Sequence, residues 1–204
     1  MKPIWKNVLA AAALLAVAGA AGCVVPCLQP LFTDQDATFD PALLGTWETN
    51  KETFTFTRHQ DKNEYRILDR QASGSQATLA AWTGRIGGKD YLCATLDPEA
   101  MPELGRMFLF PNHTLVFRIE QTAPELRLVA LNLEACKKLL QGKPDATPHV
   151  MLKPTDEKDA IPVLTGSTAE LQRFVREYGD AAGLFPAKEA LTFKRPVKGG
   201  ELQP

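Results

Sequence analysis

The chain has 204 residues, of which 45% are hydrophobic and 23% charged, and its 23 basic and 24 acidic side chains give a formal net charge of −1. The length suits one domain with its own core. Basic residues are scattered along the chain, and no block of five like charges occurs. This pattern argues against a nucleic-acid partner.

The first 22 residues predict a removable export signal. Lys2 and Lys6 precede an apolar run over residues 8–18, which small residues follow up to Gly22. The run is too short to cross a bilayer, because a membrane helix needs about 20 apolar residues. Its removal from the 204 residues would leave 182, with 21 of the 23 basic residues against 24 acidic ones.

Cys23 directly follows these small residues, and together they resemble the lipobox of bacterial lipoproteins. The resemblance implies cleavage before Cys23 and lipid attachment to it. Two or three acyl chains on one residue would make the anchoring effectively permanent. Val24, rather than an aspartate, implies sorting to the outer membrane, on its periplasmic face. A secreted protein with a free Cys23 is the alternative.

The next segment, residues 23–42, predicts a lipidated cysteine and a tether. Pro26 and Pro30 prevent a helix there, and the segment offers few apolar residues to bury. We expect a single β-rich domain over residues 43–196 and a polar tail over residues 197–204.

Alternation of polar and apolar residues predicts strands in this domain. Phe54 and Phe56 alternate with threonines, residues 60–63 form a turn, and Tyr65 and Ile67 continue the pattern. A second hairpin is expected at Gly87-Gly88, since two glycines supply positive φ at a tight turn. Residues 122–125 predict a third hairpin.

Two helices are expected late in the chain. Asn132 can cap the first, which Gly142 ends. Ser167 and Glu170 form a capping box for the second, which stops at Gly179.

With a short last strand at residues 190–194, the pattern predicts a mainly β fold with two short helices. At least seven strands joined by short turns favour an antiparallel meander. The lipocalin-like motif Gly45-Thr46-Trp47 implies, by resemblance, that this meander closes as an up-and-down barrel. An open antiparallel sheet with helices on one face, an α+β fold, is the alternative.

Residues 39–47, FDPALLGTW, resemble the opening of a group of uncharacterised bacterial envelope lipoproteins, and residues 164–174 are similar to that group's C-terminal helix. The resemblance implies a shared fold, but the group has no agreed activity to transfer. Gly45-Thr46-Trp47 also resembles the G-x-W motif of lipocalins. That likeness implies a lipocalin-like barrel whose tryptophan packs across the closed end; a plain core tryptophan is the alternative.

The sequence predicts no catalytic or metal site. It contains no G-x-S-x-G, S-x-x-K, H-E-x-x-H or C-x-x-C motif, and its three histidines are far apart. We therefore expect no enzyme and no cofactor. Among the cysteines after Cys23, we expect a disulfide between Cys93 and Cys136, with buried free thiols as the alternative.

Three functions remain open. The first is a non-catalytic envelope lipoprotein, anchored through Cys23, whose domain binds an envelope protein or serves structurally. The second is a lipocalin-like carrier of a lipid or small apolar molecule, and the third, least favoured, is an enzyme whose site is assembled from distant residues. The aromatic side chains expected to contact an apolar ligand, or to fill a solid core equally well, are Trp47, Phe54, Phe56, Tyr65, Trp82 and Phe117.

Overall fold

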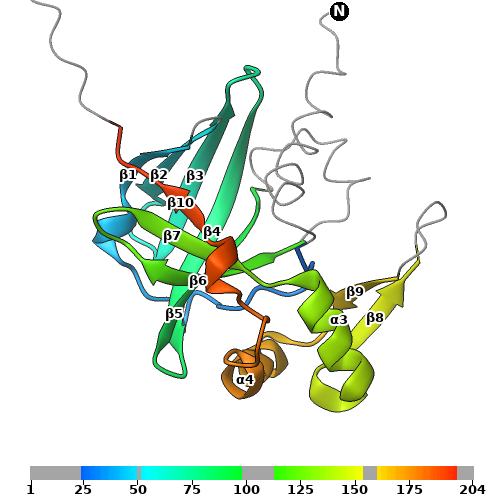
Figure 1. The fold of residues 1–204 in the computed structure, drawn as a ribbon. Coiled ribbons are helices and arrows are strands. Elements are labelled where there is room, and N and C mark those ends of the chain that lie inside the picture. Colours follow the sequence, from blue (N-terminus) through cyan, green and yellow to red (C-terminus); the bar gives the residue numbers. More distant parts are fainter. Residues whose placement is uncertain (1–23, 50–51, 98–112, 154–159, 197–204) are drawn as a thin grey trace, which may run out of the picture.

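A computed structural model describes residues 24–49, 52–97, 113–153 and 160–196 (Figure 1). The strands are β1 (Gly45–Glu48), β2 (Glu52–Arg58), β3 (Glu64–Gln71), β4 (Gln76–Ile86), β5 (Lys89–Leu96), β6 (Leu115–Gln121), β7 (Leu126–Ala130), β8 (His149–Leu152), β9 (Ile161–Leu164) and β10 (Leu191–Phe193). The helices are α3 (Leu133–Gly142) and α4 (Thr168–Tyr178), and short 3-10 turns occur at η1 (Pro41–Leu43), η2 (Pro144–Ala146) and η3 (Ala187–Glu189).

Eight strands form one antiparallel sheet in the order β1-β2-β3-β4-β5-β6-β7-β10. Its two edges meet where Glu48 and Lys194 exchange backbone hydrogen bonds of 2.8 and 2.9 Å. The sheet is therefore a nearly closed, up-and-down barrel. The expected mainly β meander with two short helices is confirmed, and the open-sheet alternative is not what forms.

The expected turns and helix starts occur at the residues that signal them. Gly87 and Gly88 have φ values of 59° and 80° between β4 and β5, as a tight hairpin turn requires. The Asn132 side chain accepts a hydrogen bond from the Ala135 N–H at 3.0 Å, and both bonds of the Ser167 capping box are present. Within the described residues, no helix is long and apolar enough to cross a membrane.

A second, two-stranded sheet pairs β8 with β9 beside the barrel (Figure 1). The sequence analysis missed this hairpin. Pro162 lies inside β9, and a proline within an apolar run argues against a strand unless the strand lies at an edge or a bulge.

The protein has two apolar cores, one on each side of the barrel wall. Inward-facing side chains fill the barrel, and outward-facing side chains of β4 to β7 pack against α3, α4, β9 and the N-terminal segment. Figure 1 shows these added elements gathered on one side of the barrel. Strands β4 to β7 are consequently buried on both faces.

Residues 24–40, which we call the N-terminal strap, are part of this outer core, so the expectation of a tether over residues 23–42 is wrong for its described part. Val25 and Leu31 are fully buried. Backbone hydrogen bonds join Cys27 to Thr114 at 3.0 and 2.8 Å and the Leu28 N–H to the Leu164 carbonyl at 2.9 Å. The prolines prevent a helix but leave the chain free to pair in an extended form.

The strap crosses the outer face of β4 at a point where that strand has no side chain. A Cβ atom on Gly84 would lie 2.4 Å from Cε1 of Phe32, so the glycine makes room for the ring. From α4, the Thr168 hydroxyl donates to the Pro30 carbonyl at 2.7 Å and the Gln172 amide donates to the Leu31 carbonyl at 3.0 Å. The strap is thus held between β4 and α4.

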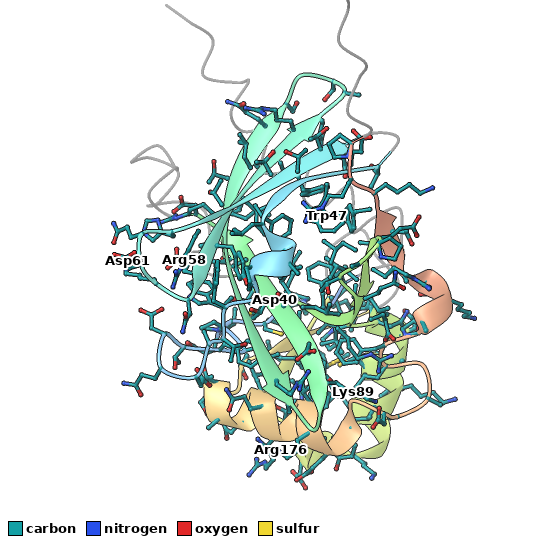
Figure 2. The ribbon with its side chains drawn as sticks, turned by 90° about the vertical axis from the view of Figure 1, so that its left-hand side faces the viewer. Asp40, Trp47, Arg58, Asp61, Lys89 and Arg176 are labelled. Carbon is teal, nitrogen blue, oxygen red and sulfur yellow. The ribbon has the colours of Figure 1, made fainter. Side chains whose placement is uncertain are left out.

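Trp47 and Arg195 close one end of the barrel. The Trp47 indole N–H donates to the Leu43 carbonyl in η1 at 2.8 Å, and Trp47 lies near the η1 turn that follows Asp40 (Figure 2). The Arg195 guanidinium stacks 3.6 Å above the Trp47 ring and donates to the Leu44 carbonyl at 2.7 Å. This arrangement joins the last described residues of the chain to the first strand of the barrel.

We predict that Leu31→Ala lowers the free energy of unfolding by about 2–5 kcal/mol, because it leaves a cavity in the outer core. Leu28→Ala removes the same atoms at a half-buried position and should cost clearly less. Urea denaturation of both variants measures the difference. Equal, near-zero losses would mean that the strap does not contribute to the fold.

Gly45→Ala should also destabilise the protein, by about 1–3 kcal/mol, because φ at this residue is strained for any side chain. Gly45 has a φ of +99°, and its added Cβ would lie 2.8 Å from Nη1 of Arg195. Gly142→Ala, in open space without a positive φ, is the matched control. Thermal unfolding followed by circular dichroism compares the two; a Gly45→Ala melting temperature equal to that of the control would contradict the prediction.

Candidate binding pocket

The barrel encloses an apolar pocket of about 70 Å³ that opens to one side. Every described residue that lines it is apolar: Val24, Phe54, Phe56, Ile67, Leu79, Leu92, Ala94, Leu115, Phe117, Leu126, Leu128, Ala130, Leu191 and Phe193. An engineered apolar cavity of about 150 Å³ stays dry and binds benzene. The enclosed part of this pocket is smaller, and suits a small apolar group or the end of a chain.

Strand periodicity builds this lining. Successive side chains of a strand point to opposite faces, so alternate residues of seven strands reach the interior. Phe54 and Phe56 on β2, for example, share the inner face with Ile67 on β3 through the pairing of Phe56 with Ile67. The pocket therefore depends on the registers of the whole meander.

The two ends of the barrel differ. At the closed end, where β1 begins and β2 ends, η1 and Trp47 fill the interior. At the open end, β6 begins at Leu115 and β7 ends at Ala130, and both residues line the pocket together with Val24. Val24 pairs with Asn132, just beyond β7, which places the start of the strap at the open end.

Three of the six predicted aromatic residues line the pocket: Phe54, Phe56 and Phe117. Trp47 and Tyr65 lie at the closed end instead. The Tyr65 ring stacks on Phe39 with centroids 4.9 Å apart, and its hydroxyl donates to the Asp40 carbonyl at 3.0 Å. These two residues fill the barrel end rather than form the pocket wall.

Trp82 does not line the pocket, and its prediction is wrong. It packs against the outer core, and its indole N–H donates to Oδ1 of Asp34 in the strap at 3.3 Å. Both faces of β4 are apolar because both are buried, so alternation in the sequence does not distinguish the inner face from the outer one. Leu79 on β4 and Leu92 on β5, which pairs with Thr83 of β4, face the pocket, and knowledge of the β4 register would have identified them.

Asp69 is a buried carboxyl group that the sequence analysis overlooked. It lies directly opposite Phe54 across β2 and β3, and therefore shares the inner face with that pocket residue. Its exposed fraction is 1%, and within the described part of the chain neither carboxyl oxygen has a hydrogen-bond partner. Burial raises the pKa of Asp69 to about 6. A buried carboxyl group without a hydrogen-bond partner is unusual in a barrel wall, and this one lies beside the pocket residue Phe54.

Charged side chains also gather on the outer face of β3. Arg66 contacts Glu64 at 3.3 Å, forms an ion pair with Asp97 and donates to Nδ1 of His59 at 3.1 Å. These groups pair with one another, as a structural ion-pair network does. In the described ranges, no group of three or more histidine, cysteine or acidic side chains could hold a metal ion.

The cysteines of the described chain are buried free thiols. Cys27, Cys93 and Cys136 all belong to the outer core, so the disulfide expected between Cys93 and Cys136 is not formed and the free-thiol alternative describes them. Burial raises the pKa of Cys93 to about 11 and that of Cys136 to about 12. Such thiols are poor nucleophiles. Cys23, the predicted lipid acceptor, lies outside the described residues.

No protein-family profile, curated protein or solved structure matches this chain.

We predict that the contribution of Asp69 to the stability of the protein falls as the pH rises from about 4 to 6. Asp69 has an ordinary pKa of 3.8 when unfolded and about 6 when folded, so in this range the folded state binds more protons. Its contribution is largest below pH 4 and is lost above pH 6. Each pKa unit corresponds to about 1.4 kcal/mol, so Asp69→Asn should stabilise the protein at pH 7.5 by about 1–3 kcal/mol.

Urea unfolding of the wild type and of Asp69→Asn at a series of pH values measures this dependence. The exposed Asp61→Asn is the matched control and should leave the profile unchanged. Parallel profiles for the wild type and Asp69→Asn would show that Asp69 is ionised in the folded protein without cost.

Proposed function

We propose that the protein is a lipid-anchored protein of the bacterial cell envelope that binds one end of an apolar molecule, such as an acyl chain, in its barrel. The observation that carries this proposal is the pocket, because all of its described lining residues are apolar and it is open on one side. The barrel fold suits a carrier of the lipocalin type. The anchor would be Cys23, and the outer membrane its location.

The size of the pocket limits the ligand. Sites for whole drug-sized molecules occupy about 300–1,000 Å³, whereas this pocket measures about 70 Å³. The bound part is therefore a terminal segment of a chain or a single small ring, and the remainder of the ligand lies outside the open end. Among the described residues no nucleophile beside a base adjoins the lining, and we propose binding rather than catalysis.

The proposal predicts that filling the pocket abolishes ligand binding. Ala94→Leu and Ala130→Leu each place three further carbon atoms in the pocket, and Ala182→Leu makes the same change at an exposed residue. We expect Cys23→Ser protein to bind a fluorescent naphthylamine probe that myristate displaces. Each pocket variant should weaken binding at least tenfold, and Ala182→Leu should not change it.

Overpacking costs about 1–3 kcal/mol of stability, so circular dichroism must show that the variants remain folded. Native mass spectrometry of the same Cys23→Ser protein, purified without detergent, identifies any ligand carried from the cell. Absence of both a retained ligand and probe binding would refute a carrier function. An envelope-protein partner, sought by crosslinking in cells, would then be the function to test.

A further inference from the structure

The start of the strap is paired with the domain from Val24 onward, so no flexible linker separates the proposed lipid anchor from the folded domain. Val24 pairs with Asn132, the Val25 N–H donates to the Leu131 carbonyl at 3.4 Å, and the Leu164 N–H donates to the Pro26 carbonyl at 2.9 Å. Consecutive Cα atoms are about 3.8 Å apart. A lipid on Cys23 is therefore attached within one residue of the domain surface.

An exposed apolar strand lies beside this attachment point. Val150, Met151 and Leu152 on β8 are 45%, 40% and 53% exposed, and they are the exposed large hydrophobic residues of the described chain. Most apolar side chains of the described chain are buried in one of the two cores, which makes three consecutive exposed ones on a single strand exceptional.

The strand pairings place the β8–β9 hairpin beside the strap. Cys27 pairs with Leu164 of β9 in parallel, and the Leu164 N–H donates to the Pro26 carbonyl at 2.9 Å. Leu164 is in turn paired with His149, the first residue of β8. Neighbouring strands are about 4.8 Å apart, so β8 lies about 10 Å from the strap at this point. In Figure 1 the β8–β9 hairpin and the start of the strap lie on the same side of the barrel.

We propose that the domain contacts the bilayer directly, with the outer edge of β8 inserted into the interfacial region as a second contact beside the acylated Cys23. An edge-on strand brings Val150 and Leu152 on one face and Met151 on the other into the lipid together. The inference rests on the lipidation proposed above. Lys153, exposed at the end of the run, suits the headgroup layer. Because Val24 lines the pocket, this seating turns the open side of the barrel toward the membrane, from which an acyl chain could enter without crossing water.

A second copy of the chain is the other occupant that the outer edge of β8 could accept. The membrane is favoured because the exposed apolar strand belongs to the hairpin beside the strap, so that β8 and a lipid on the residue before Val24 could contact the same bilayer. Contact with a second copy of the chain does not require the apolar strand to lie beside the lipid.

Spin labels on the lipidated protein test the seating. The full chain is expressed with its signal, purified, and reconstituted into phosphatidylethanolamine–phosphatidylglycerol vesicles after mass spectrometry of the lipid on Cys23. Nitroxides are attached to Met151→Cys or, as the control, to Asp61→Cys in the β2–β3 turn (Figure 2). The native thiols described are buried, with raised pKa values, and should not react.

Collision with oxygen, which partitions into lipid, is compared with collision with a water-soluble nickel chelate. We expect several-fold weaker nickel collision at Met151 than at Asp61, with stronger oxygen collision. A flexible Gly-Ser insertion between Cys23 and Val24 keeps the lipid but releases the domain, and the difference should shrink. Val150→Ser with Leu152→Ser, two exposed substitutions, should reduce it as well.

Equal nickel collision at Met151 and Asp61 in the lipidated protein would overturn the seating, and so would the absence of lipid on Cys23. Spin–spin broadening between Met151 labels in soluble Cys23→Ser protein would assign β8 to a second copy, against the proposal. None of these results affects probe binding to Cys23→Ser protein. Failure of the membrane contact and failure of the carrier function are therefore distinguishable.

Discussion

The docking of the N-terminal strap onto the outer face of the barrel is the constraint on which the rest of the structure depends. An eight-stranded barrel of this size needs only an inner core, yet β4 to β7 are apolar on both faces and must be covered. The strap, α3, α4 and β9 provide that cover. Phe32 against Gly84 and the hydrogen bonds from α4 show that the covering elements are fitted to one another and to the wall.

The strap runs from the open end of the barrel to its closed end. At one end the strap leads into η1, where Trp47 and Arg195 close the barrel. At the other end it begins at Val24, on the rim of the pocket. One extended segment thus contacts both the open end and the filled end of the barrel.

The sequence predicted those elements whose signals are local. Alternation identified the meander, Gly87-Gly88 a hairpin, and the Ser167 capping box a helix, because turns and caps depend on residues close together in the chain. The strap was misread because its partners, Thr114 and Leu164, are remote in sequence. Trp82 was placed inside the barrel because a strand buried on both sides carries no alternation. The partnerless state of Asp69 is likewise visible only once the registers are known.

The contacts of the strap also bear on the order in which the protein folds. Its hydrogen-bond partners reach Thr168 and Gln172, 138 and 141 residues further along the chain. Contacts between residues so far apart in sequence form late, because the entropic cost of closing a long loop comes before the stabilising free energy of the contact. If the protein is exported as proposed, the strap would leave the translocation pore first and yet be among the last segments to acquire its final position. Enzymes that process the proposed export signal would therefore act before the strap is held between β4 and α4.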